Sequence, residues 1–156
     1  MFKRIFGSKK KVENLVSPLS GKVMSLSEVP DPVFSEKMMG DGIAVFPEVG
    51  EVVSPVDGEI IQVFPTKHAV GIRSAQGVEI LIHIGLETVS LNGEGFTAHV
   101  KEGDAVKVGQ RLITFDKAFL EANAPSIVVP IVITNQDKVK NMSQVGSETV
   151  EMGKDV

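Results

Sequence analysis

The chain has 156 residues, of which 42% are hydrophobic and none is Cys, Trp or Tyr, and its formal net charge is −4. This length and composition suit one globular domain, and the absence of cysteine excludes disulfides, thiolate nucleophiles and thiolate metal sites. No apolar run approaches the roughly 20 residues of a membrane span, and the acidic balance argues against nucleic acid as a partner. We therefore expect a cytoplasmic protein.

Residues 1–11 differ in charge from the rest of the chain. They carry five basic residues and no acid, which leaves a charge of −9 on residues 12–156. Phe2, Ile5 and Phe6 would share one side of a helical turn, a composition typical of weak amphipathic membrane anchors. We predict a flexible basic amphipathic tail at residues 1–11, in weak contact with a membrane surface and peripheral to its inner face, and a single domain over residues 12–156.

From Val12 onward, short apolar runs alternate with Gly, Pro, Asp and Ser. Such punctuation is typical of many short strands that pack into a sandwich or barrel. We predict strands near residues 14–17, 21–26, 42–46, 51–54, 58–63, 68–73, 78–84, 97–100, 111–115, 126–134 and 147–151. A brief helix is expected at 117–122 and a turn near 137–142. The predicted fold class is all-β: an antiparallel β-sandwich or barrel-sandwich with an internally duplicated, hybrid motif and at most one or two short helices.

The duplication is visible as a short repeat. Residues 16–23 and 53–60 share the pattern V-S-P-x-x-G-x-(V/I), 37 positions apart. Only two copies occur, which excludes a solenoid in practice. We therefore expect two interleaved β-units in one compact sandwich.

His83 lies in the aliphatic run 78–84, which is typical of a buried strand. A titratable group in such a strand must be hydrogen-bonded or used chemically. His68 lies fifteen residues earlier in a second strand-like segment, and residues 74–77 between the two have turn chemistry.

The geometry of that turn decides whether the two histidines meet. A two-residue loop at Ala75 and Gln76 would place them directly opposite each other, with Cβ atoms about 4.5–5.5 Å apart, and a turn centred on Gln76 and Gly77 would make them diagonal neighbours. A three-residue loop would put them on opposite faces. Either of the first two turns predicts a polar centre with aliphatic walls, typical of a reactive site. Its members would be Thr66, His68, Val70, Leu81, His83 and Gly85.

The residues around both histidines match a known signature. Residues 82–89 read I-H-I-G-L-E-T-V, and residues 66–69 read T-K-H-A. Further matching stretches, in the same order, are 18–21, 29–34, 40–44, 55–58 and 91–96. The set spans roughly residues 14–135, with a motif-matched core at about 31–135. In these motifs the chain resembles the glucose-type enzyme IIA of the bacterial phosphoenolpyruvate-dependent sugar phosphotransferase system.

The resemblance implies a phosphoryl carrier, a phosphotransferase component. His83 would accept a phosphoryl group from the histidine phosphocarrier HPr and pass it to a cysteine on the IIB domain of a sugar transporter. A neutral imidazole is a nucleophile at cytoplasmic pH, and a backbone carbonyl of residues 85–88 is the candidate group to fix its tautomer. His68 would stabilise the phosphoryl oxygens, and Thr66 would orient His68. His99 has no partner motif and is expected to be solvated.

A carrier of this kind also needs a docking surface. We expect an exposed apolar collar around the histidines and an acidic rim that suits a basic partner. The collar is predicted at Phe34, Ile43, Val45, Phe64 and Val89, and the rim at Glu36, Asp41 and Glu87. No cofactor is required for such a carrier.

Other classes of function stay open at this point. Zinc hydrolases of a related duplicated β-fold need a His-x-His strand, which this chain does not have. Two histidines also cannot fill a catalytic zinc site, which takes three protein ligands. Zinc at His68 and His83 is therefore expected only if a partner completes the site. The chain could also be a regulatory binding module without transfer activity. A lipoyl carrier is a weaker match, because Lys117 opens a predicted helix and does not lie on a tight hairpin.

Overall fold

The computed structural model describes residues 2–6, 11–135, 141–144, 149–150 and 152. Its helices are α1 (Pro32–Ser35) and α2 (Lys117–Asn123), with short 3₁₀ turns η1 (Leu26–Glu28) and η2 (Thr88–Leu91). Its strands are β1 (Phe2–Phe6), β2 (Lys11–Leu15), β3 (Gly21–Ser25), β4 (Asp41–Pro47), β5 (Glu51–Val53), β6 (Gly58–Val63), β7 (Ala69–Ser74), β8 (Glu79–His83), β9 (Phe96–Ala98), β10 (Ala105–Val106), β11 (Arg111–Phe115), β12 (Val129–Ile133), β13 (Asn141–Gln144) and β14 (Thr149–Val150).

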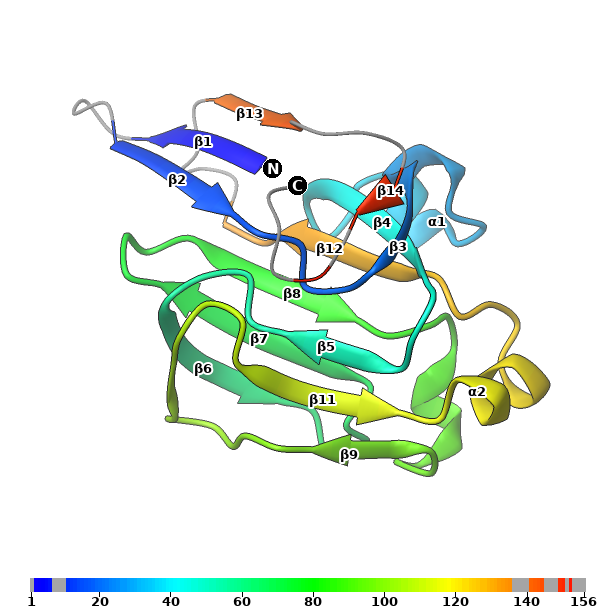
Figure 1. The fold of residues 1–156 in the computed structure, drawn as a ribbon. Helices are drawn as coiled ribbons and strands as arrows, with labels where there is room; N and C mark the ends of the chain where they lie inside the picture. Colours follow the sequence, from blue (N-terminus) through cyan, green and yellow to red (C-terminus); the bar gives the residue numbers. More distant parts are fainter. Residues whose placement is uncertain (1, 7–10, 136–140, 145–148, 151, 153–156) are drawn as a thin grey trace.

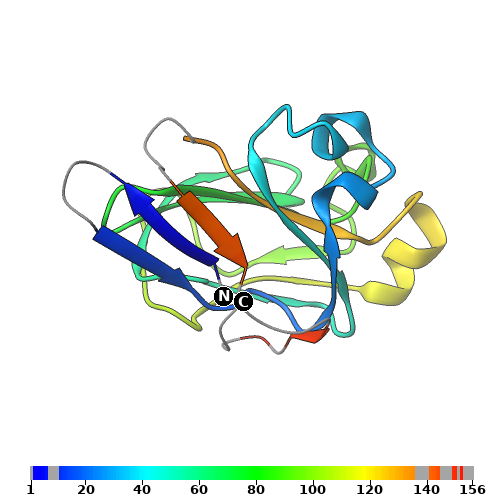
Figure 2. The ribbon, with the colours of Figure 1, turned by 90° about the horizontal axis from the view of Figure 1, so that it is seen from above.

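These strands form three antiparallel sheets (Figure 1). The large sheet has the order β10-β6-β7-β8-β12-β4-β3-β14, and the small sheet β5-β11-β9 packs in front of it. A third sheet, β13-β1-β2, lies at the end of the molecule away from α1 and α2, as the view from above shows (Figure 2). The prediction of an all-β sandwich with two short helices is confirmed.

The central strands of the large sheet are buried on both faces. Its inner face packs on the small sheet in a core that includes Ile82, Ile131 and Ile113. On its other face, Leu81 and Val132 belong to a second cluster with Phe34 and other apolar residues of the η1–α1 segment. Because side chains alternate along a strand, the central strands β7, β8, β12 and β4 contribute to both clusters. This second cluster lies beside the histidines.

The two copies of the repeat lie against each other. The backbone N–H of Val16 donates to the carbonyl of Pro55 (3.1 Å), and that of Val53 donates to Pro18 (2.9 Å). In each copy the buried serine donates to the carbonyl two residues later, at 2.5 Å from Ser17 and 2.6 Å from Ser54. The shared sequence pattern therefore corresponds to a shared backbone conformation.

The structure differs from the sequence analysis at several elements. The backbone of residues 2–6 forms strand β1, where a flexible tail was expected, and residues 1 and 7–10 lie outside the described residues. Strand β13 and helix α1 were not predicted. Of the turn expected near 137–142, residues 137–140 lie outside the described residues, and 141–142 belong to β13.

The hairpin that carries the histidines has a three-residue loop. Ala69 pairs with His83 and Arg73 with Glu79, and the N–H of Ser74 donates to Val78 at 2.8 Å. The two-residue turn that would have opposed His68 and His83 is therefore wrong. Val70, predicted beside them, lies in the inner core instead.

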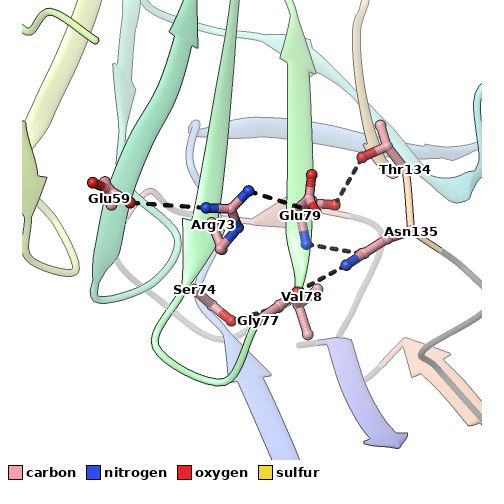
Figure 3. Close-up of polar contacts among 8 residues, drawn as sticks. All are labelled: Glu59, Arg73, Ser74, Gly77, Val78, Glu79, Thr134 and Asn135. Carbon is pink, nitrogen blue, oxygen red and sulfur yellow. Dashed lines mark hydrogen bonds and ion pairs between the residues drawn. The ribbon is translucent and has the colours of Figure 1, made fainter. Parts of the chain in front are cut away.

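The loop of this hairpin is held by Asn135, which follows β12 (Figure 3). The Asn135 side chain accepts from the N–H of Glu79 (2.9 Å) and donates to the carbonyl of Gly77 (2.8 Å). Arg73 lies between Glu59 and Glu79, at 3.9 Å from each carboxylate. Such exposed ion pairs contribute little, so Asn135 is the stronger constraint on the register.

Replacing Asn135 by alanine should lower the free energy of unfolding by about 1–3 kcal/mol, because two backbone groups lose their partners. Asn135→Asp retains the acceptor and loses the donor, so it should fall between the wild type and alanine. Urea denaturation of the three proteins measures the difference. Equal midpoints would contradict a role for this side chain in holding the loop.

Candidate functional site

His83 is the last residue of β8, which runs toward the side of the molecule where α1 and α2 lie (Figure 1). Its side chain is half-buried and shares the outer face of the large sheet with Leu81 and with Ala69, its cross-strand partner. The chain then turns at Gly85, whose φ of +75° lies in the left-handed region. A histidine is thus placed at the end of a rigid strand, at the edge of the core.

The hydrogen bond to the ring of His83 fixes its tautomer. Nδ1 lies 2.8 Å from the carbonyl oxygen of Gly85, within the turn where a tether was expected. A carbonyl oxygen can only accept, so Nδ1 of the neutral ring must carry the proton. The lone pair therefore lies on Nε2, which is the nitrogen able to act as a nucleophile.

His68 is buried, with 3% of its surface exposed, and its ring centroid lies 4.8 Å from that of His83 with the planes at 81°. The three-residue loop would separate the two side chains if both lay in regular strands. His68, however, precedes β7 and follows Lys67, which has a φ of 59°. Its carbonyl still accepts from Ile84 (2.7 Å). Because His68 lies outside the regular strand, strict alternation does not fix the direction of its ring.

Thr66 contacts His68 as predicted, with Oγ1 2.5 Å from Nδ1. When the hydroxyl donates to Nδ1, the proton of the neutral imidazole lies on Nε2, which becomes a donor. Aromatic rings pack on both histidines: Phe34 lies 5.1 Å from His83 and Phe64 lies 5.4 Å from His68, between ring centroids. The site thus combines a free imidazole lone pair with a second ring that, in this tautomer, offers an N–H donor, both within apolar walls.

The electrostatics of the site keep both rings neutral near pH 7. Burial, and then the neighbouring His83, lower the pKa of His68 from 6.5 to about 4. Burial also lowers the pKa of His83, against the opposing effects of the Gly85 carbonyl and the Asp31 carboxylate. A neutral His83 retains the lone pair that nucleophilic attack requires.

These shifts predict how stability depends on pH. Between pH 6.5 and about 4 the unfolded chain binds a proton at His68 that the folded chain does not, so stability should be full above 6.5 and decrease as the pH falls through this range. His83 acts in the same direction. Denaturation at several pH values should give a shallower dependence for His68→Gln than for the wild type. An NMR titration midpoint of His68 at or above 6.5 would contradict its burial.

The predicted docking residues divide by exposure. Val89 is 55% exposed, Glu36 and Glu87 are exposed, and Phe64 and Asp41 are half-buried. The prediction that Ile43 and Val45 are exposed is wrong, because both side chains lie in the inner core. Side chains alternate along a strand, so Ala44 between them faces the second cluster. Phe34 is also buried, yet it contacts His83. Asp41 forms an ion pair with Lys37 at 3.3 Å.

Several residues at this site were not predicted from the sequence. Asp31 acts on the pKa of His83 and lines a cleft of about 440 Å³ together with Leu86 and Glu87. Asp31 also caps α1 by accepting from the N–H of Val33 (3.0 Å), and an Asp-Pro pair is a helix-start signal that could have revealed α1. Three apolar side chains near α1 are exposed: Val33, Met38 and Met39.

The structure also bears on the alternative functions. Within the ranges that the structure describes, no group of three or more His, Cys, Asp or Glu residues is arranged to hold a metal ion.

His99 is exposed and its Nε2 lies 2.9 Å from Thr114 Oγ1, so it is solvated as predicted. Lys117 begins α2 and lies 3.8 Å from Glu121. Among the described residues, no helix has the length and apolar character needed to cross a bilayer.

Comparisons with known proteins identify the family of this chain. A family model for the EIIA 1 component of the phosphoenolpyruvate-dependent sugar phosphotransferase system matches residues 13–139. The chain is 54% identical over 155 residues to a glucose-specific EIIA component of Bacillus anthracis, covering 98% of this chain and 94% of the relative. It is 55% identical over 123 residues to a glucosamine-specific EIICBA component of Bacillus subtilis, covering 79% of this chain and 20% of that protein.

The fold has a counterpart among solved structures. Glucose permease IIA from Mycoplasma capricolum superposes with a TM-score of 0.89 at 41% sequence identity, covering 94% of this chain and 95% of that one. This antiparallel sandwich is thus the fold of a phosphotransferase-system component. The chain belongs to the EIIA 1 family of the phosphoenolpyruvate-dependent sugar phosphotransferase system.

Proposed function

We propose that the chain is a phosphoryl carrier that accepts a phosphoryl group on Nε2 of His83 from phospho-HPr and passes it to a cysteine of a sugar-transporter IIB domain. The observation that carries this proposal is the hydrogen bond from Nδ1 to Gly85, which leaves the Nε2 lone pair free beside His68. The relative from Bacillus subtilis has its EIIA part in one chain with EIIC and EIIB. A IIB acceptor is therefore the natural partner.

The transfer needs little covalent help from the protein. The Nε2 lone pair of His83 forms the new bond to phosphorus while the bond from phosphorus to the donor's imidazole nitrogen breaks, and its electron pair stays on the donor. Nδ1–H of His83 remains bonded to Gly85. His68 donates from Nε2 to the phosphoryl oxygens, where charge develops in a site with little water. Onward transfer repeats these steps with the acceptor's thiolate as nucleophile.

Intact-protein mass after incubation with phosphoenolpyruvate, enzyme I and HPr tests this function. We expect the wild type to gain one phosphoryl group, labile in acid as a phosphoramidate is, and to lose it when the IIB domain is added. A wild type that gains no mass would overturn the carrier proposal and favour a regulatory binding module.

Metal analysis of the same sample tests the separate prediction of zinc at His68 and His83 with a ligand from a partner.

The docking surface is proposed to include the exposed side chains Met38 and Val89 with the acidic Glu87 beside the site. Met38 is 70% exposed, so Met38→Asp should leave stability unchanged. It should raise the HPr concentration for half-maximal rate by about tenfold, the effect expected of a hot-spot residue.

Val108→Asp is the matched control, since Val108 is 48% exposed and its N–H bonds to Asp57. Asp57 in turn contacts the hairpin loop at the far end of β8 through Ala75. Equal kinetics for both variants would contradict this placement.

A cytoplasmic location, peripheral to the inner face of the membrane, is part of the proposal because the acceptor belongs to a membrane transporter. The five basic residues within residues 1–11 support weak attraction to anionic lipids. Sedimentation with vesicles that contain an anionic lipid, compared with neutral vesicles, measures this contact.

A further inference from the structure

We propose that Thr88 is a positioning residue that holds the Gly85 carbonyl and thereby keeps His83 in its nucleophilic tautomer; this inference rests on the proposed function of His83. Thr88 is fully buried, and its Oγ1 donates to the carbonyl of Ile84 at 2.5 Å. This bond closes the turn that contains Gly85. The Thr88 hydroxyl bonds to a backbone carbonyl, so its effect on the chemistry passes through the backbone.

The two peptide units on either side of Gly85 are each held at both ends. In the first unit, the carbonyl of Ile84 accepts from Thr88 and the N–H of Gly85 donates to Val128 (3.0 Å). In the second, the carbonyl of Gly85 accepts from His83, and the N–H of Leu86 donates to Ser126 (3.0 Å). A trans peptide directs its C=O and N–H to opposite sides, so these contacts aim the Gly85 carbonyl at Nδ1.

Thr88 provides the only side-chain bond in this arrangement other than that of His83 itself. Glycine has two soft dihedrals and adopts positive φ without steric cost, so Gly85 needs outside constraints. The Thr88 methyl leaves no room for a larger residue at this position, because a Cβ on Gly85 would lie 2.6 Å from Thr88 Cγ2. Loss of the Thr88 hydroxyl leaves the first peptide unit held only through the N–H of Gly85, so this unit can rotate more. The carbonyl would then hold Nδ1–H less well, and more of the ring would carry its proton on Nε2.

The test compares Thr88→Val, which removes the hydroxyl at nearly constant shape, with Thr88→Ser, which retains it. Long-range proton–nitrogen correlation NMR of the unphosphorylated protein reports the tautomer of His83 directly. We expect Thr88→Val to lower the fraction of the Nδ1–H tautomer and to slow phosphorylation by about tenfold, as one lost hydrogen bond predicts. Thr88→Ser should restore both. If the valine chain does not fold, Thr88→Ala takes its place under the same tautomer criterion.

Ser54→Ala is the matched control for a merely structural effect. Ser54 is also buried and donates to a backbone carbonyl, that of Val56, at 2.6 Å, but it lies in the repeat and not in the turn after His83. It should lose comparable stability and retain the wild-type tautomer. An unchanged tautomer in Thr88→Val, or a failure of Thr88→Ser to restore it, would overturn the inference. Neither result touches the proposed function, which fails only if the wild type takes no phosphoryl group or if His83 is not the residue that carries it.

Discussion

His83→Ala is expected to take up no phosphoryl group under conditions in which the wild type is fully modified. The substitution removes the only Nε2 lone pair that the Gly85 contact exposes, and no cysteine offers a substitute nucleophile. The loss should be complete and not partial. Intact-protein mass with enzyme I, HPr and phosphoenolpyruvate measures it.

The control for His83→Ala is His99→Ala. His99 is the exposed third histidine, hydrogen-bonded to Thr114 at 2.9 Å, and its loss should leave the mass gain intact. Circular dichroism and thermal unfolding of both variants separate loss of the nucleophile from loss of the fold. A phosphorylated His83→Ala, or an unmodified His99→Ala with a native fold, would contradict the assignment of His83.

The second large effect is expected at His68. His68→Ala should still accept the phosphoryl group but should pass it to the IIB domain about 10²–10³-fold more slowly, the range expected when one preorganised donor is removed. The reason is the placement of a buried donor ring 4.8 Å from the ring of His83. Single-turnover transfer from isolated phosphoprotein to the IIB domain measures the rate without the loading step.

Two further observations distinguish this role from simple packing. His68→Gln retains an N–H donor and should recover part of the rate that alanine loses. In the phosphorylated wild type, the added negative charge should raise the pKa of His68 above its value of about 4 in the free protein, since an adjacent opposite charge favours the protonated ring. Equal transfer rates for the wild type and His68→Ala would exclude a part for His68 in the transfer.

Much of the fold follows from local sequence. Apolar runs bounded by Gly, Pro, Asp and Ser predict most of the strands, and the repeated V-S-P-x-x-G pattern predicts two copies that the structure places in mutual contact. The aliphatic run around His83 predicts a strand that holds a titratable ring at its end. These features depend on residues close together in the chain, where turn chemistry and side-chain period decide the structure.

The histidine pair itself was decided by tertiary structure. The sequence allowed three turns, and the structure adopts the one that should separate His68 from His83. His68 lies between the left-handed Lys67 and the start of β7, outside the regular strand whose alternation would separate the two rings. The side chain of Asn135, more than fifty residues along the chain, holds the loop in this register. The local sequence around the loop does not predict a constraint from so distant a residue.

The exposure of the predicted docking residues likewise could not be deduced from the sequence. Strand β4 is apolar on both faces because one side packs on the small sheet and the other on the η1–α1 segment. The alternation of side chains along β4 predicts that Ile43 and Val45 lie on the same face of the strand. It does not predict which face of the strand is turned toward the histidines. The sequence by itself determined the residue types, most of the strands and which histidine is proposed as the nucleophile. The packing of the sheets and of α1 determined which of those residues surround it.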